Sequence, residues 1–341
     1  MYLVGEPIFG FNENLERYVA PFSQLEQCWN IFNEKPRVRI EKKLAEEYLA
    51  IIVALGELGI DFRVILSRPE ADKETIDLCR AAHHVKFAGF TPDYSPSTMM
   101  FPRDFATTLP KCVLTNPTVR PVTDMKKGWR IIQSPFGEGG RLLSAGDTVL
   151  ISDRVRLSGQ HSRQTMVAEI KEIESSGVTV GMFPPPVSGF YSVRGVADSI
   201  GFDDHIDRVA CLVRDRLDFP HLIVDHRLHL ANVTGETPLS WELIEPGDAI
   251  RLLQERFKPL GIQVHEAPPS IVPYSLNLLQ FPDRRVLMTS GVPEIEALIG
   301  GLVGSKNVIT TRCPIRYYPT WKYGGIRCLV VESPDVLFIG P

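Results

Sequence analysis

The chain reads Tyr-Gly-Gly-Ile-Arg-Cys-Leu at residues 323–329, directly before the apolar residues Val330 and Val331. The two glycines lack a Cβ atom, so the backbone can turn tightly there and approach a ligand. A cysteine attacks as its thiolate and needs access and a polar setting. Cys328, placed at the start of a predicted strand, is therefore either a nucleophile facing a pocket or an ordinary buried cysteine.

The composition of the 341 residues, 44% hydrophobic and 23% charged, is that of a globular protein. The net charge of −4 gives no reason to expect a nucleic acid or an anionic membrane as a partner. Six cysteines occur without CxxC or zinc-finger spacing, and residues 1–11 have neither a basic start nor a cleavage site. The sequence therefore predicts a cytoplasmic protein with reduced thiols.

Four stretches repeat the order of helix, glycine and short strand. Apolar residues recur at helical spacing, and a glycine suits the left-handed backbone that often ends a helix. The predicted helices cover residues 39–58, 165–174, 248–257 and 293–303. The strands that follow them cover residues 61–66, 178–183, 262–266 and 308–312.

Hairpins are predicted between these units, and a fifth, less regular unit lies near residues 122–133. The hairpins cover residues 104–115, 141–153, 209–224 and 276–290. Together the elements predict an internal repeat of small β-β-α-β modules. The alternative is an ordinary α/β protein, since many of these alternate the same elements without any repeat.

Three further motifs lie beside apolar runs, where strands are predicted to end or begin. Asp104 follows Phe-Pro-Arg at residues 101–103, and Glu138 precedes two glycines. His205 and Asp207 are separated by one residue, which would place both on one face of an extended strand. Taken singly, each has an ordinary alternative: a turn aspartate, a loop glutamate and a surface polar pair.

Taken together, a thiol, a histidine and three carboxylates favour a cationic substrate. Extra negative charge would oppose an oxyanion, so the set is poor for a protease. A guanidinium is planar and offers five N–H donors that pair with carboxylates. Asp104 and Asp207 could hold it from two sides, with the Cys328 sulfur above its central carbon. The cation would then favour the thiolate.

These motifs, in this order, resemble those of the guanidino-group-modifying enzymes of the pentein fold. That family contains arginine deiminase, agmatine deiminase, dimethylarginine dimethylaminohydrolase and the amidinotransferases. The resemblance implies an α/β propeller of five ββαβ modules around a pseudo-fivefold axis, here formed by residues 1–341 as one catalytic domain. It also implies that no metal or other cofactor is used.

The resemblance also implies a role for each matching residue. Cys328 matches the nucleophile, His205 the acid/base, and Glu138 the carboxylate beside the histidine. Asp104 and Asp207 match the two aspartates that bind the guanidinium. The expected activity is therefore hydrolysis of a guanidino compound through a covalent cysteine–amidino intermediate, as in deiminases and dihydrolases.

The substrate itself is less clearly indicated. Arg141 follows the two glycines where the family often has an acidic residue, and Arg327 stands before the cysteine where several members differ. An arginine-like substrate needs an anchor for its carboxylate, and we rank Arg154 and Arg156 first among the candidates. Agmatine would need no such anchor. The other candidates are Arg163, Arg316 and Arg327.

Two other functions stay open on the sequence. An amidinotransferase of the same fold would replace water by an amine in the second step, and a non-catalytic pentein-fold protein would only bind a partner. The expected partner is a small guanidino substrate, with assembly into a homo-oligomer left open. Three histidines, His221, His226 and His229, lie close in sequence, but no fourth ligand with finger spacing accompanies them.

Overall fold

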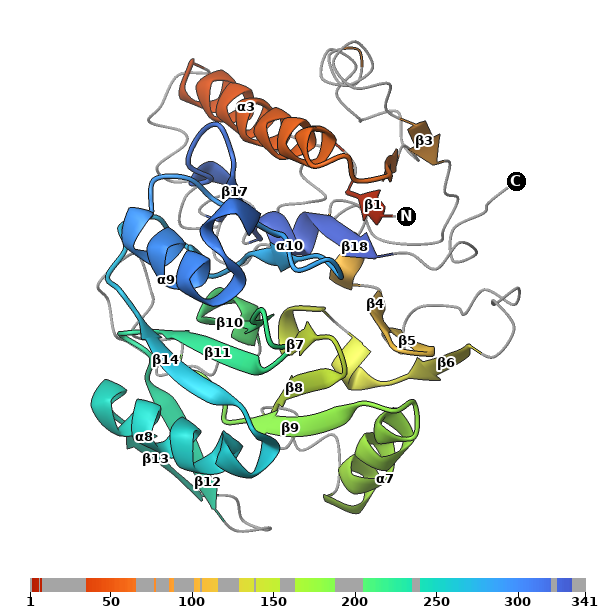
Figure 1. The fold of residues 1–341 in the computed structure, drawn as a ribbon, viewed down its shortest axis with the longest axis vertical. Helices are drawn as coiled ribbons and strands as arrows, with labels where there is room; N and C mark the ends of the chain where they lie inside the picture. Colours follow the sequence, from red (N-terminus) through yellow and green to blue (C-terminus); the bar gives the residue numbers. More distant parts are fainter. Residues whose placement is uncertain are drawn as a thin grey trace.

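The structure is a computed structural model, and strands and helices alternate along it in a mixed α/β fold (Figure 1). No helix in the described part of the chain has the length and apolar character needed to cross a bilayer. The residues described are 2–5, 7, 35–65, 77, 86–88, 101–104, 106–115, 129–137, 139–153, 163–187, 205–234, 240–319 and 324–332.

Five sheets in these ranges share one plan, in which an antiparallel pair of strands is extended by a parallel strand. The first two sheets consist of β4 (Ala106–Leu109), β5 (Cys112–Thr115) and β6 (Arg130–Gln133), and of β7 (Leu142–Ala145), β8 (Thr148–Ser152) and β9 (Thr179–Phe183). The next two consist of β10 (Ala210–Arg214), β11 (Pro220–Asp225) and β14 (Gln263–Ala267), and of β15 (Leu279–Gln280), β16 (Val286–Met288) and β17 (Val308–Thr310). The fifth consists of β18 (Val330–Glu332), β1 (Tyr2–Val4), β2 (Phe62–Ile65) and β3 (Lys86–Ala88). A separate hairpin joins β12 (Leu230–Thr234) to β13 (Ser240–Ile244).

Helices connect the parallel strands of four of these sheets. They are α3 (Lys35–Glu57), α7 (Arg163–Glu174), α8 (Pro246–Phe257) and α9 (Pro293–Val303). Both α8 and α9 begin with a proline, whose missing N–H costs nothing in the first turn. Gly59 and Gly261, just beyond α3 and α8, have φ values of 64° and 68°, where other residues would be strained.

The internal repeat predicted from the sequence is confirmed in these elements. All four predicted helices and their following strands are present, and the four predicted hairpins are antiparallel pairs. Only β6 of the fifth unit, near residues 122–133, lies within the described residues. The repeat was visible because a glycine stands between each of these helices and the strand that follows it.

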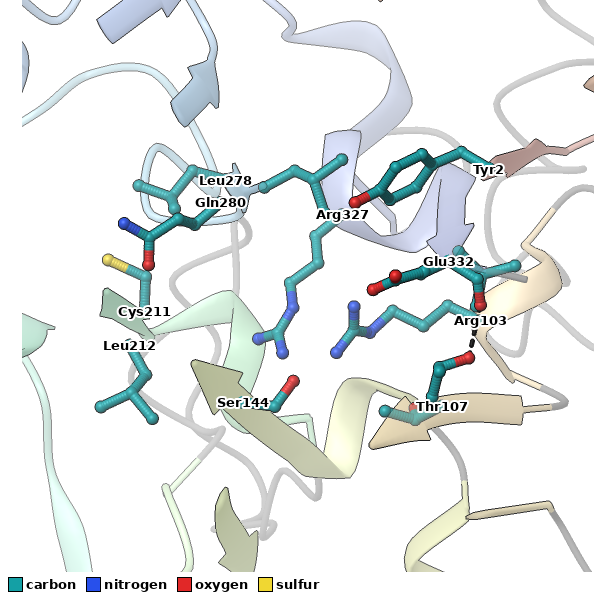
Figure 2. Close-up of a pocket in the computed structure, with 13 residues that line it drawn as sticks. Tyr2, Arg103, Thr107, Ser144, Cys211, Leu212, Leu278, Gln280, Arg327 and Glu332 are labelled. Carbon is teal, nitrogen blue, oxygen red and sulfur yellow. Dashed lines mark hydrogen bonds between the residues drawn. The ribbon is translucent and has the colours of Figure 1, made fainter. Parts of the chain in front are cut away.

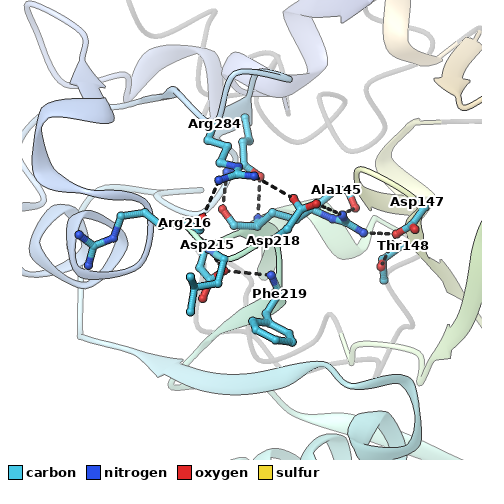
Figure 3. A network of polar contacts seen from close by, with 11 residues as sticks. Ala145, Asp147, Thr148, Asp215, Arg216, Asp218, Phe219 and Arg284 are labelled. Atoms are coloured by element: carbon cyan, nitrogen blue, oxygen red, sulfur yellow. Dashed lines mark hydrogen bonds and ion pairs between the residues drawn. The ribbon is translucent and has the colours of Figure 1, made fainter.

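Polar contacts join the turns of three successive hairpins (Figure 3). Arg214, at the end of β10, forms an ion pair with Asp147 in the turn between β7 and β8 and another, of 3.1 Å, with Asp218. Arg284, in the turn between β15 and β16, donates to the backbone oxygen of Arg216 at 2.6 Å. These contacts hold three sheets side by side.

The first strands of the sheets also lie next to one another. Strand β18 contacts β4, and β7 contacts β10. Helix α3 supports the sheet that contains β18, because its buried face packs in one core cluster with Leu329 and Val330. The Glu47 carboxylate of α3 accepts hydrogen bonds from the backbone N–H groups of residues 316–318, at 2.7–3.0 Å.

Short helical turns carry the four motifs. They are η1 (Pro102–Asp104), η3 (Gly139–Arg141), η5 (Ile206–Arg208) and α10 (Ile326–Leu329). Further turns of this kind among the described residues are η2 (Pro135–Gly137), η6 (Lys258–Leu260) and η7 (Ser305–Asn307). Two predictions of local structure were therefore wrong: Cys328 lies in a helical turn before the strand, and His205 and Asp207 do not lie on an extended strand.

Candidate active site

The four motif-bearing turns meet at one place in the fold, although up to 224 residues separate them, from residue 104 to residue 328. Turn η1 contacts both α10 and η3, and η3 contacts η5. A hydrogen bond between Cys328 and Asp207 joins α10 to η5 and completes the set. The structure thus brings together the backbone of all the motifs that pointed to guanidino chemistry.

Cys328 and Asp207 face each other in a buried setting. They are 7% and 1% exposed, and the Cys328 thiol donates to Asp207 Oδ2 at 3.4 Å. The second carboxylate oxygen, Oδ1, is buried and has no hydrogen-bond partner among the described residues. Leaving such an oxygen unpaired costs free energy, about 1–3 kcal/mol or more for a charged group. A cation that paired with Asp207 would remove that cost.

Asn277 connects these two residues and was missed by the sequence analysis. Its Nδ2 donates to Asp207 Oδ2 at 3.0 Å and lies 3.4 Å from Cys328 Sγ. Its Oδ1 accepts the backbone N–H of Arg327 at 2.8 Å. Asn277 is 3% exposed, so its side chain is locked by these contacts. It holds the sulfur, the carboxylate and the start of α10 in one arrangement.

The two glycines of the second motif allow two side chains to approach the backbone. A Cβ atom on Gly140 would lie 1.8 Å from Cδ2 of His205, and one on Gly139 would lie 2.1 Å from Cγ of Arg103. The imidazole of His205 therefore covers Gly140, and Arg103 covers Gly139. Arg103 Nε also donates to the Gly139 carbonyl at 3.4 Å.

Glycines serve a similar purpose in the last motif. A Cβ on Gly325 would lie 2.5 Å from Oδ1 of Asn277, and one on Gly324 would lie 2.5 Å from the ring of Phe101. Each glycine of this pair thus makes room for a side chain from another part of the chain. The glycines were predicted to let the backbone approach a ligand. In this structure protein side chains approach it instead, so the approach of a ligand stays a prediction.

Several predicted site residues lie outside what the structure describes. Glu138, Arg154 and Arg156 are outside the described residues, and so is the side chain of Arg163. Asp104 is the last residue of η1, but its side chain is not among those described. Its backbone lies in the turn that contacts α10 and η3. The guanidinium contacts and the carboxylate anchor predicted for these residues therefore stay predictions.

The other two arginines considered as anchors have different surroundings. Arg316 is exposed, and its backbone N–H donates to Glu47. Arg327 is 5% exposed and lines a cavity of about 70 Å3 together with Arg103 (Figure 2). The residues lining this cavity do not include Cys328, His205 or Asp207. The cavity is therefore distinct from the place where the sulfur and the carboxylate meet.

The histidines considered as metal ligands make separate contacts. His221 Nε2 lies 3.2 Å from Asp215, His226 Nδ1 lies 3.3 Å from Asp225, and His229 Nε2 lies 3.2 Å from Glu245. His221 also stacks on His265. Among the described residues, no group of three histidine, cysteine or carboxylate side chains is arranged to hold a metal ion.

No protein-family model matches the chain, and no curated protein matches its sequence. Similar solved structures include agmatine deiminase from C. jejuni, which is 13% identical with a TM-score of 0.51, over 87% of this chain and 90% of that chain. A DDAH mutant from Pseudomonas aeruginosa in complex with citrulline is 15% identical with a TM-score of 0.45, over 84% and 87%. The N-terminal domain of ArgZ, a cyanobacterial arginine dihydrolase, is 12% identical with a TM-score of 0.42, over 76% and 82%.

The likeness to the agmatine deiminase extends over most of both chains. At 13% identity it shows the fold alone, and that fold is the one expected from the order of the motifs. The resemblance drawn from the sequence is therefore confirmed at the level of the fold.

Proposed function

We propose that this chain, which has the fold of the guanidino-modifying pentein enzymes, is a hydrolase of a guanidino compound. The observation that carries the proposal is the buried Asp207 carboxylate, whose Oδ1 lacks a hydrogen-bond partner among the described residues while Oδ2 meets the Cys328 thiol. A guanidinium would pair with this carboxylate and bring its central carbon toward the sulfur. Few other small ligands combine a positive charge with an electrophilic carbon.

Binding of the cation would also activate the nucleophile. In the free protein the carboxylate next to Cys328 favours the neutral thiol, because a second negative charge nearby is unfavourable. A bound guanidinium neutralises Asp207 and adds a positive charge beside the sulfur. The thiolate would then form when the substrate is in place, which makes the cysteine selective for cationic substrates.

The reaction would proceed in two steps through a covalent intermediate. The Cys328 thiolate attacks the amidino carbon, and His205 gives a proton to the departing nitrogen. His205 then removes a proton from a water molecule, which attacks the carbon and releases the thiolate and a ureido product. Glu138, next in sequence to the glycines under His205, would stabilise the imidazolium, as a carboxylate does for other catalytic histidines.

The remaining residues would position these groups. Asn277 would hold Asp207 and Cys328 at a fixed separation, and Asp104 would bind the guanidinium from the side of η1. Arg154 and Arg156 are the proposed anchors for a substrate carboxylate. These roles rest on motif position for Asp104, Glu138 and the two arginines, and on contacts for Asn277.

We also propose that residues 1–341 form one domain in which five modules surround a pseudo-fivefold axis. Support comes from the five sheets with one plan and from the cavity, because its walls include the first strand of each sheet: β4, β7, β10, β15 and β18. In this arrangement the active site lies at one end of the axis, where the motif-bearing turns meet.

The proposal is tested by incubating the protein with arginine, agmatine, methylarginines and guanidino acids. Formation of a ureido product with release of ammonia or an amine is expected for at least one of them. The Cys328→Ser variant should be inactive, whereas Cys313→Ser, a matched change in a partly buried cysteine elsewhere, should retain the activity. A new guanidino product that requires added glycine would instead show amidinotransfer, and no product with any substrate would favour a binding protein.

A further inference from the structure

Two adjacent residues of α3 hold the chain on both sides of the short turn α10, which carries Cys328. Helix α3 packs in one core cluster with strands β1 and β18 (Figure 1). Glu47 and Tyr48 of this helix are buried, with 4% and 0% of their surface exposed. The reaction proposed above gives neither residue a role. Each of them nevertheless makes hydrogen bonds that lead toward α10.

The Tyr48 hydroxyl reaches α10 through one intervening residue. It donates to the carbonyl oxygen of Gly5 at 2.8 Å. The backbone N–H of Gly5 in turn donates at 2.8 Å to the carbonyl oxygen of Leu329, the residue after Cys328. The residue before Cys328 is also held, because its backbone N–H donates to Asn277 Oδ1 at 2.8 Å. The backbone around the cysteine is thus fixed at two points, and one of them depends on Tyr48.

The Glu47 carboxylate holds the chain that precedes α10. It accepts hydrogen bonds from three successive backbone N–H groups, those of residues 316–318, at 2.7–3.0 Å. Burial raises the pKa of Glu47, and these bonds oppose that effect because they stabilise the charged form. Tyr318 is fully buried in the same core cluster as Ile326 and Cys328. Because such cores are closely packed, a shift of residues 316–318 would be transmitted to α10.

The place of α10 in the fold decides what the Cys328 sulfur contacts. The sulfur lies 3.4 Å from Asp207 Oδ2 and 3.4 Å from Asn277 Nδ2. Asp207 belongs to η5 and Asn277 precedes β15, so neither residue is part of the turn that carries the cysteine. A displacement of α10 would therefore change both contacts. In catalysis, a misplacement of about 1 Å can lower a rate on the order of a hundredfold.

We propose that Glu47 and Tyr48 are positioning residues, which hold the Cys328 sulfur against the Asp207 carboxylate. They act on the sulfur through backbone groups on either side of α10, and not through contact with a substrate. The proposal rests on the proposed function, since it takes Cys328 as the nucleophile. Because both residues lie on one helix, a shift of α3 would displace both flanks of α10 together.

Tyr48→Phe is the smallest change that tests the proposal, because it removes the hydroxyl and keeps the ring in the core. We expect kcat for the active guanidino substrate to fall about tenfold with KM changed less than about twofold, since the sulfur is displaced and the substrate-binding carboxylates are not. Glu47→Gln should lower kcat at least as much, because its amide presents N–H donors where the backbone N–H groups need an acceptor. Steady-state kinetics measures both variants.

Two controls separate positioning from other effects of these changes. Glu46→Gln removes a negative charge from an exposed neighbour on α3. Ile299→Val shortens a fully buried side chain of α9 by one carbon, which lowers the stability of a different core cluster. Both controls should keep the kcat of the wild type, and the unfolding midpoint of every variant is measured alongside.

A second readout does not depend on catalysis. A neighbouring carboxylate disfavours the thiolate, so a sulfur that moves away from Asp207 should react at lower pH. The rate of iodoacetamide labelling at Cys328, mapped by mass spectrometry, should therefore reach half its maximum at a lower pH in Tyr48→Phe than in the wild type. Ile299→Val should leave this midpoint unchanged, because a general loss of stability does not change the charges around the sulfur.

The outcomes separate this proposal from the proposed function. A wild-type protein that hydrolyses no guanidino compound would refute the function, whereas a shifted labelling midpoint would still support positioning by α3. Wild-type kcat and an unchanged midpoint in Tyr48→Phe and Glu47→Gln, or equal effects in Ile299→Val, would overturn the positioning proposal. If neither variant folds, hydrogen exchange of the wild type decides: slow exchange at the Gly5 amide supports the proposal, and exchange as fast as in an exposed loop overturns it.

Discussion

Cys328 and Arg327 are consecutive residues of α10, but they face two regions of opposite charge. The Cys328 sulfur meets the Asp207 carboxylate and the Asn277 amide, whereas the Arg327 guanidinium faces a cavity that also contains Arg103. Gly139 and Gly140 are divided in the same way, since Arg103 covers the first and His205 the second. In the last motif, Cys328 therefore faces the proposed active site, and its neighbour Arg327 faces the cavity.

This difference places groups of opposite charge on two sides of one short helical turn. The active-site region has a buried carboxylate oxygen without a partner, so it favours a cationic substrate. The cavity has the buried guanidinium of Arg327 in its lining, so a second cation is unfavourable there. A short helical turn carries both residues, but their side chains face different regions. A change in one region should therefore be detectable separately from a change in the other.

The largest effect after loss of the nucleophile is expected for Asp207→Asn. The variant keeps the size of the side chain and removes the charge that would pair with the guanidinium. Breaking a buried charge pair costs roughly 3–5 kcal/mol, so kcat/KM should fall at least about a hundredfold. Steady-state kinetics on the active substrate measures this, with the exposed Asp248→Asn on α8 as control. Activity like that of the wild type would exclude Asp207 as a guanidinium ligand.

Gly140→Ala and Gly139→Ala should separate the two regions most clearly. The new Cβ in the first variant would displace the His205 ring, and general acid–base catalysis is worth about 10²–10⁴ in rate. Turnover should therefore fall about a hundredfold or more. In the second variant the displaced group is Arg103 rather than the proposed acid/base, so turnover should fall less.

The comparison of these glycine variants depends on measuring turnover and the unfolding midpoint of each protein. Turnover should fall more in Gly140→Ala than in Gly139→Ala, although the new Cβ would meet a side chain at 1.8 Å in the first variant and at 2.1 Å in the second. Equal losses of turnover in both variants, with equal drops in the unfolding midpoint, would show that the two regions are not separate and that the glycines only maintain the fold.

A smaller effect is expected for Asn277→Ala. Hydrogen bonds to charged groups contribute about 1.5–3 kcal/mol, so the loss of the contacts to Asp207 should lower kcat about tenfold to a hundredfold. Asn277→Asp adds a negative charge beside the sulfur, which should shift the pH–rate profile to higher pH. An unchanged profile in Asn277→Asp would mean that Asn277 supports only the backbone of Arg327.

The sequence predicted the repeat well because its signals are local. Each predicted helix ends next to a glycine, and at Gly59 and Gly261 the backbone has the positive φ that favours glycine. The hairpins were visible because their apolar strands flank polar turns such as that at residues 282–284. Local patterning of this kind needs no knowledge of distant contacts, and the four hairpins and crossovers were correct.

The site was predictable only where a motif marked it. Asn277 lies in no motif, and its contacts with Asp207 and Cys328 cross 70 and 51 residues, so spacing could not reveal it. The cavity likewise depends on Arg103, Thr107 and Arg327 meeting across the fold. His205 and Asp207 were expected on one face of a strand, but the turn η5 directs Asp207 to the sulfur and leaves His205 over Gly140.

The central claim is that Cys328 forms a covalent bond to the amidino carbon of a guanidino substrate. The most direct measurement is mass spectrometry of the protein quenched during turnover, followed by mapping of the modified peptide. We predict an amidino adduct on Cys328 alone among the six cysteines, absent from Cys328→Ser. Turnover without any adduct on Cys328, or unchanged turnover in Cys328→Ser, would contradict the account.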